Sequence, residues 1–253
     1  MIGFPASLRL ATVSAIIVPF SFLVSAEPLV WDFENDTAGG VPAADMLTVA
    51  NENTDDGNKV LVADASTEPG DPTGVTGNKS VYIHRQQDAT TQPMVQLSLP
   101  EALKAGTLTF DLYIPGTSTS GLAEVDLGTF KPNDPLSRLK SLAAVQFSTR
   151  SSGASDVSGV SHFSGSTSGT DVKTTHGRTI LKEKNVVAIT WSGTGTYSIK
   201  VNGELVVSDQ FPDGNFPAAN AQVGEVSAVR FTTASTKASP DYFFDNVSIT
   251  QNP

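Results

Sequence analysis

The sequence has no cysteine. Disulfide bonds are therefore excluded, and so is a lipoprotein anchor attached to an N-terminal thiol. Burial of apolar side chains must hold the fold together, and a chain of 253 residues is long enough to build one large core.

Positive charge is also scarce, because 16 Lys and Arg stand against 26 Asp and Glu, a formal net charge of −10. An acidic surface repels phosphate groups, so nucleic acids and anionic membranes are unfavourable partners. An anionic polysaccharide is disfavoured less strongly, since a local cluster of basic side chains can outweigh a global field that salt screens.

The first 26 residues carry one charge, Arg9, followed by the apolar run from Leu10 to Val24 and the small residues Ser25 and Ala26. This order is typical of a secretory signal peptide. A membrane-spanning helix is the weaker interpretation, because Pro19 interrupts the run and no basic residue follows it. We expect cleavage after Ala26, export to the periplasm or the extracellular space, and no membrane anchor after cleavage.

Strand alternation, rather than helical periodicity, dominates the rest of the chain. The clearest case has an apolar residue at every second position: Leu108, Phe110, Leu112 and Ile114. A period of two is typical of a half-buried strand. The same parity places Val145 and Phe147, and also Val229 and Phe231, on the core faces of two further strands.

Turn residues mark a predicted meander. The apolar segments 186–191, 196–201 and 204–207 are separated by Ser192-Gly-Thr-Gly195 and by Asn202-Gly203. Asn-Gly is the preferred pair of a two-residue type I′ turn, because both positions need a positive φ. We therefore predict antiparallel strands joined by two hairpin turns.

Residues 149–179 are rich in Ser, Gly and Thr. This composition buries little apolar area, so it predicts long loops around short edge strands. No internal repeat or linker divides the chain. The expected architecture is a single all-β domain over 27–253, built as a two-sheet antiparallel β-sandwich.

Separated segments of the chain resemble a known family. The strand ending at Trp191, with the strand and turn from Tyr197 to Val207, resembles the central meander of laminin-G-like and related concanavalin A-like domains. Residues 29–34, Leu-Val-Trp-Asp-Phe-Glu, are similar to the opening strand of such domains, and residues 242–249, Tyr-Phe-Phe-Asp-Asn-Val-Ser-Ile, to the closing strand. The resemblance implies a concanavalin A-like jelly roll, a fold that carries lectins, hydrolases, lyases and adhesion modules.

In such a fold the terminal strands lie side by side, which would bring Asp32 or Glu34 near Asp245. Asp245 shares the parity of Phe243 and Val247, so its carboxylate would point toward the apolar side and need compensation. Relatives of this fold often hold a structural calcium near this seam, and carboxylate oxygens are ligands that calcium takes. Asp32, Glu34 and Asp245 are therefore candidate calcium ligands. The alternative is that Asp245 caps backbone N–H groups or pairs with an arginine.

Parity also predicts a polar sheet face. If the apolar members of each strand face the core, these side chains point the other way: Tyr82, His84, Asp111, Tyr113, Gln146, Arg150 and Arg230. On one curved sheet they would form a sugar-binding surface, because tyrosine rings stack on sugar faces and polar groups bond the hydroxyls.

The same residue types suit a polysaccharide lyase that acts on uronic acids. His84 and Tyr113 would transfer the proton, and Gln146 and Arg150 would neutralise the uronate carboxylate. The longer strand motifs of alginate lyases with this fold are missing from the sequence. Polar residues on sheet faces are also ordinary, and Asp111 can pair with an arginine of a neighbouring strand.

Glu124-Val125-Asp126 resembles the start of the Glu-x-Asp-x-x-Glu strand of laminarinase-type glycoside hydrolases. A retaining hydrolase needs two carboxyl groups about 5 Å apart, and Gly128 and Thr129 stand where the second glutamate would. A short strand with a solvated acidic face is the simpler interpretation. Trp31 and Trp191 share parity with apolar residues and are expected in the core rather than on a sugar platform.

These observations favour a secreted, non-catalytic β-sandwich that binds a polysaccharide or another surface partner, with structural calcium as the one candidate cofactor and no cofactor as the alternative. The main alternative is a polysaccharide-degrading enzyme, a lyase before a glycoside hydrolase. A purely structural exported module is a further alternative.

Overall fold

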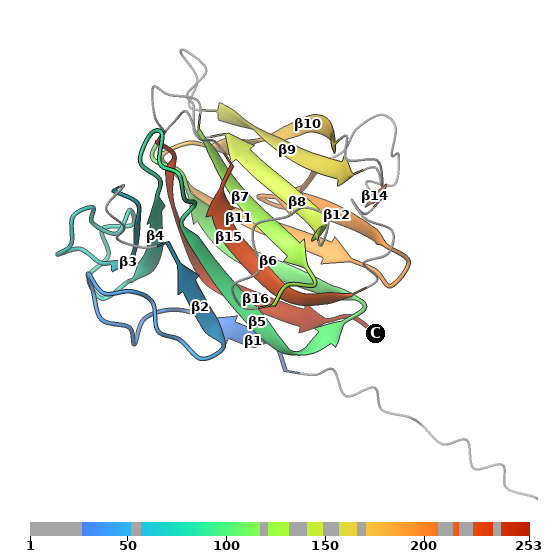
Figure 1. Cartoon of the computed structure of the whole chain (residues 1–253), viewed down its shortest axis with the longest axis horizontal. Helices are drawn as coiled ribbons and strands as arrows, with labels where there is room; N and C mark the ends of the chain where they lie inside the picture. Colours follow the sequence, from blue (N-terminus) through green and yellow to red (C-terminus); the bar gives the residue numbers. More distant parts are fainter. Residues whose placement is uncertain are drawn as a thin grey trace, which may run out of the picture.

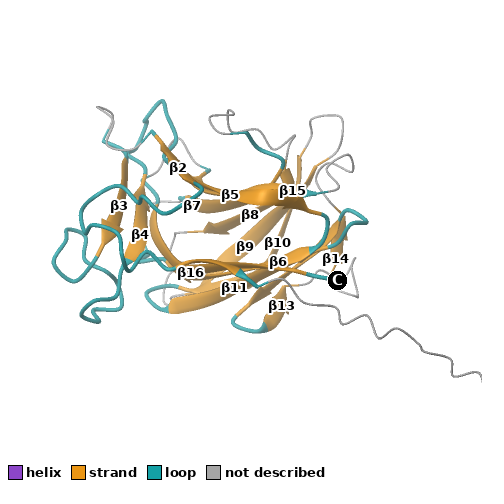
Figure 2. Ribbon diagram, turned by 90° about the horizontal axis from the view of Figure 1, so that it is seen from below, coloured by secondary structure: helices purple, strands orange, loops and turns teal. Residues whose placement is uncertain are grey.

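The computed structural model describes residues 27–51, 57–116, 121–131, 141–148, 157–165, 171–206, 215–217, 225–234 and 239–253. The predicted signal peptide and Arg150 lie outside these ranges. The described chain folds into two antiparallel sheets that pack face to face, with β5, β15 and β8 in one layer and β16, β6 and β11 in the other (Figure 2). The predicted two-sheet sandwich is confirmed. The described residues contain no helix that could cross a membrane.

Sheet A has nine strands, most of them in the order β13-β12-β11-β6-β16-β4-β3. All of these except β13 are labelled in Figure 1. The short strand β1 adds to β16, and β14 adds to β12. Their bounds are β1 Leu29–Trp31, β3 Lys59–Ala63, β4 Ser80–His84, β6 Gly106–Tyr113, β11 Lys184–Trp191, β12 Thr196–Val201, β13 Glu204–Val206, β14 Asn215–Pro217 and β16 Asp241–Gln251.

Sheet B has seven strands in the order β10-β9-β8-β7-β15-β5-β2. Their bounds are β2 Leu47–Ala50, β5 Met94–Leu103, β7 Leu122–Gly128, β8 Ser141–Ser148, β9 Val157–Gly165, β10 Asp171–Ile180 and β15 Val226–Thr233. The late strand β15 lies between β5 and β7. The middle of this sheet is therefore built from segments that are far apart in the sequence.

The core lies between the sheets, and the predicted alternation supplies it. Leu108 and Phe110 of β6 are 0% and 1% exposed. Across the interface, the ring of Phe231 from sheet B stacks on Phe244 from sheet A with centroids 3.9 Å apart. Trp191 is 1% exposed, and its indole N–H donates to the Leu103 carbonyl at 3.1 Å. Both tryptophans are buried in this core, as predicted.

The predicted meander is also confirmed, as β11, β12 and β13 pair in sequence. Asn202 and Gly203 form the second turn with φ values of 53° and 82°. Both positions have the positive φ of a type I′ turn.

The prediction of long loops around short edge strands was wrong for two segments of the Ser/Gly/Thr-rich region. β9 and β10 are nine and ten residues long, and they pair with each other at the edge of sheet B. Threonine accepts the extended backbone readily, and pairing of β9 with β8 extends an existing hydrogen-bonded ladder. The prediction from composition therefore underestimated the length of the strands that pairing with a neighbouring strand stabilises.

Candidate functional site

Polar side chains from four neighbouring strands form a row on the outer face of sheet B. Alternation turns the apolar residues of β7 toward the core, so Glu124 and Asp126 point the other way. Register places Glu124 opposite Gln146 of β8 and Asp126 opposite Arg230 of β15. Arg230 in turn lies opposite Gln96 of β5. Gln96, Glu124, Asp126, Gln146 and Arg230 are called the sheet B row below.

The sheet B row is buried, each side chain being 6% exposed or less. The expected solvated acidic face at Glu124 and Asp126 is therefore wrong. Part of the cover is the segment that follows β7. The guanidinium carbon of Arg230 lies 4.1 Å from the ring centroid of Phe130, and its Nη2 donates to the Lys131 carbonyl at 3.3 Å.

Hydrogen bonds link neighbours within the sheet B row. Nε2 of Gln146 donates to Oε2 of Glu124. Nε of Arg230 donates to Oε1 of Gln96 at 2.8 Å. Oε1 of Gln146 is buried with no hydrogen-bond partner among the described residues. A buried acceptor in this condition suits a ligand or a water that donates a hydrogen bond.

The two carboxylates of β7 lie on the same face of one strand. Glu124 and Asp126 are two residues apart on one strand, a separation of roughly 6.7 Å along the backbone. Gly128 is the next residue on the same face and carries no side chain. The strand therefore carries no third carboxylate of the Glu-x-Asp-x-x-Glu pattern.

Four of the predicted site residues lie on the outer face of sheet A instead. Tyr82 and His84 belong to β4, and Asp111 and Tyr113 belong to β6. The ring of Phe243 connects the tyrosines, with centroids 4.9 Å from Tyr82 and 6.0 Å from Tyr113. Tyr82 is 6% exposed, the same fraction as Glu124 of the sheet B row.

The expectation that the seven polar residues share one face is therefore wrong. Gln146 and Arg230 lie on the outer face of sheet B, and the core separates them from His84 and Tyr113 on sheet A. The predicted lyase set cannot meet on one substrate. Alternation tells which side of its strand a residue takes, but it does not tell which sheet the strand joins.

On sheet A, His84 faces Asp241, its register partner on β16. Burial lowers the pKa of His84, against the opposing effect of the Asp241 charge. Burial raises the pKa of Asp241. Nδ1 of His84 and Oδ1 of Asp241 are both buried without a hydrogen-bond partner among the described residues. Burial thus favours the uncharged forms of both groups.

At the predicted calcium seam, β1 pairs with β16 as expected, with Trp31 opposite Val247. Asp245, however, lies on the outer face of sheet A and not on the core side that parity predicted. A β-bulge follows Asp245, and Asn246 within it has a φ of 48°. The extra residue reverses the alternation, so Val247 faces the core and Asp245 does not.

Asp245 is nevertheless only 7% exposed, and its Oδ1 has no hydrogen-bond partner among the described residues. The pKa of Asp245 is raised to about 7, mainly by burial and also by the charges of Glu34, Asp111 and Asp71, although a hydrogen bond from the Asn246 backbone lowers it. This is the chemistry of a carboxylate that a cation would stabilise.

The three predicted ligands do not converge. Asp32 is exposed and accepts the Glu34 N–H at 3.3 Å. Oε1 of Glu34 accepts the Lys79 N–H at 3.2 Å, and the Lys79 ammonium donates to the carbonyls of Glu34 and Asp36, each at 2.7 Å. The described residues include no group of three or more His, Asp or Glu side chains placed to hold a metal. Of the other two predicted ligands, Glu34 is the one whose charge raises the pKa of Asp245.

Sequence reasoning missed Gln96, Asp71 and Asp241. Gln96 alternates with the buried Val95 and Leu97, so parity could have found it in the way it found Gln146. Asp71 lies in a loop, where alternation carries no information. It accepts from the Ser80 hydroxyl at 2.8 Å.

No family model and no curated protein matches this sequence. Solved structures do share the architecture. The globular domain of T. cruzi calreticulin has a TM-score of 0.55 at 10% identity, over 89% of this chain and 88% of that chain. The cellulose induced protein Cip1 has a TM-score of 0.55 at 12% identity, over 88% and 97%. The Crh5 transglycosylase, solved with NAG, has a TM-score of 0.53 at 14% identity, over 90% and 86%.

The protein has a concanavalin A-like jelly-roll fold. At identities of 10–14% the likeness extends to the fold alone. A jelly roll hosts many activities, so its function has to be argued from the site.

Proposed function

We propose that this jelly-roll protein binds carbohydrate, without cleaving it, through the sheet B row. The observation that carries the proposal is the register of five buried polar side chains across β5, β15, β7 and β8. Burying carboxylates and a guanidinium gives a fold little net stability compared with apolar packing. Groups of this kind gather where a ligand uses them.

The chemistry of the sheet B row suits sugar hydroxyls. Carboxylate oxygens accept hydrogen bonds strongly, and the unpaired Oε1 of Gln146 offers a further acceptor. The Crh5 transglycosylase solved with NAG is one protein of this fold that engages a carbohydrate.

A panel of soluble polysaccharides tests the proposal. Laminarin, xylan and chitosan represent neutral and amino sugars, and alginate and pectin represent uronic acids. Retardation in affinity gels and titration calorimetry should identify at least one binder, with no rise in reducing ends and no absorbance from unsaturated products. Replacing Gln146 by Leu should weaken binding by roughly five- to tenfold through the loss of an amide's hydrogen bonds.

Thr190→Ala on the outer face of sheet A is the matched control and should bind as the wild type does. A panel without any binder would leave the purely structural module as the better description. Release of unsaturated products would establish a lyase in place of the binder.

We also propose that the protein is exported and cleaved after Ala26, on the support of the charge-poor leader that precedes Glu27. N-terminal sequencing of the exported protein should then begin at Glu27. An intact N-terminus on the exported protein would contradict this.

We further propose a structural calcium at the β1–β16 seam, with Asp245 as its central ligand and Glu34 beside it. The support is the buried, unpaired Oδ1 of Asp245 among other carboxylates. At a calcium concentration about 100 times Kd the folded state gains about 2.7 kcal/mol, which raises the melting temperature by roughly 5–10 °C. Asp245→Asn should abolish this shift, and Asp32→Asn, at an exposed position, should retain it.

A further inference from the structure

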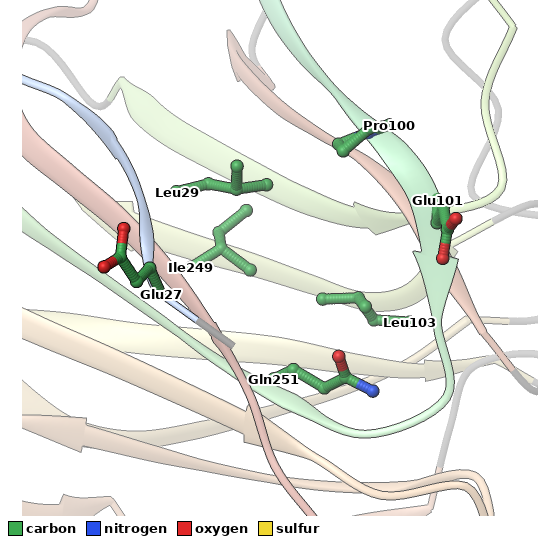
Figure 3. Close-up of a pocket in the computed structure, with 7 residues that line it drawn as sticks. All are labelled: Glu27, Leu29, Pro100, Glu101, Leu103, Ile249 and Gln251. Carbon is green, nitrogen blue, oxygen red and sulfur yellow. The ribbon is translucent and has the colours of Figure 1, made fainter. Parts of the chain in front are cut away.

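A pocket of about 230 Å³ opens beside the terminal strands, between the two sheets (Figure 3). Its lining comes from β1 and β16 of sheet A, from β5 of sheet B, and from the residue Glu27 that precedes β1. None of the sheet B row lines this pocket, so its role is independent of the proposed carbohydrate site.

One wall of the pocket is apolar. The side chains of Leu29, Ile249 and Leu103 turn toward a common space in Figure 3, with Pro100 beside them. Ile249 is 2% exposed, and Leu29 and Leu103 pack against the main core. The wall is therefore a firm extension of the core, suited to a short hydrocarbon chain.

The rim of the pocket is polar and acidic. Glu27 and Glu101 stand on opposite sides of the apolar wall in Figure 3, and the Gln251 amide lies below it. No basic residue of the described part of the chain lines the pocket, and the whole chain carries a formal charge of −10. The rim is thus complementary to positive charge.

We propose that this pocket binds a small organic cation, a primary alkylammonium compound. Its chain lies on the wall of Leu29, Leu103 and Ile249, and its ammonium lies at the acidic rim, where the negative charges of Glu27 and Glu101 attract it. The volume of about 230 Å³ is smaller than the roughly 300–1,000 Å³ of pockets that hold drug-sized ligands. A six-carbon amine therefore fits, and a drug-sized ligand does not.

In the mature chain, the new N-terminal ammonium group would compete with an added cation for the carboxylates at the rim. Cleavage after Ala26 leaves an α-ammonium group on Glu27, beside the pocket. At pH 9 an α-amino group with an ordinary pKa of about 7.7–8.0 is mostly uncharged, and an alkylamine with a pKa near that of lysine, about 10.4, is still protonated. Measurements at pH 9 therefore isolate the added cation.

The test is an NMR titration of the mature protein with hexylammonium chloride at pH 9 and low salt. Saturable shifts at the amides of Leu103 and Gln251 should give a Kd on the order of 1 mM. Glu101→Gln and Glu27→Gln should each weaken binding by about threefold. Glu204→Gln, at an exposed glutamate of β13, is the matched control and should leave the Kd unchanged.

Hexanol and hexanoate separate charge from hydrophobicity, because they keep the chain and remove or reverse the charge. Both should bind at least threefold more weakly than hexylammonium, and added salt should weaken the amine alone. Equal affinity for hexanol would overturn the proposal. So would an equal effect of Glu101→Gln and Glu204→Gln, or the lack of saturable shifts at the pocket.

Discussion

At the scale of single residues, Asp245 couples protonation to folding. Burial raises its pKa to about 7, from an ordinary value of 3.8. The folded state therefore holds the proton more tightly than the unfolded chain does. This stabilisation is present in full below about pH 4 and is lost as the pH rises through about 7.

In EDTA, we therefore expect the melting temperature of the wild type to fall relative to that of Asp245→Asn as the pH rises from 4 to 8. Calorimetric melts of both proteins across this range provide the measurement. Asp32→Asn, at an exposed carboxylate, should follow the wild type. Parallel curves for the wild type and Asp245→Asn would show that Asp245 does not titrate in this window.

Gly106 is a residue whose missing side chain makes room for the core. A Cβ added there would lie 2.5 Å from Cζ2 of Trp191 and 3.0 Å from the Thr250 carbonyl oxygen. The indole cannot retreat without losing its hydrogen bond to Leu103. Gly106→Ala should therefore cost about 2–3 kcal/mol in the free energy of unfolding, as overpacked cores do.

Urea denaturation measures that cost. Gly193→Ala is the control, because an added Cβ there meets nothing closer than 3.6 Å and the backbone has no positive φ. It should change the free energy of unfolding by less than about 0.5 kcal/mol. Similar losses in the two variants would contradict the steric argument.

At the scale of elements, the turn after β12 needs a positive φ, and this need can be tested separately from the side-chain contacts of the turn. Gly203 has a φ of 82° with open space around it, so Gly203→Ala tests conformation alone and should cost about 1–2 kcal/mol. Asn202 adds contacts, because its Oδ1 accepts the Val186 N–H at 2.8 Å and its Nδ2 donates to Asn185 at 3.1 Å.

Asn202→Ala should therefore cost more than Gly203→Ala, by roughly 1 kcal/mol. Chemical denaturation of the two variants checks this order. Asn202→Gly is the matched control, because it relieves the backbone and still removes the side-chain contacts. A smaller loss in Asn202→Ala than in Gly203→Ala would contradict the contribution of the side chain.

A strand or turn can be predicted from the sequence when neighbouring residues alone determine its conformation. Alternation identified the core positions of β6, and Asn202-Gly203 identified a turn, because both signals depend on neighbouring residues. The same alternation failed at Asp245, since the bulge at Asn246 shifts the parity by one residue. Asparagine tolerates the left-handed backbone of such a bulge, but nothing in the local pattern required one.

At the scale of the whole molecule, the candidate site depended on information that alternation does not hold. The side chains of Gln146 and His84 both point away from the core, yet Gln146 lies on the outer face of sheet B and His84 on the outer face of sheet A. Pairing partners such as β15 and β5 are more than a hundred residues apart in the sequence. Which residues make up the sheet B row can therefore be told only once the order of the strands in the sheet is known.

The two sheets share one core, and the stacked rings of Phe231 and Phe244 connect them at a centroid distance of 3.9 Å with planes 5° apart. Replacing either ring by Leu should cost about 1–2 kcal/mol. The double variant should lose about 0.5–1.5 kcal/mol less than the sum, because the ring-to-ring contact can be lost only once. Urea denaturation of the wild type, the two single variants and the double variant gives this coupling.

Phe231→Leu combined with Tyr82→Leu is the control. Tyr82 belongs to the separate cluster on the outer face of sheet A, so the losses in that pair should be additive. Additivity in the Phe231–Phe244 pair would show that the sheets are held together by burial alone, without a specific contact between these rings.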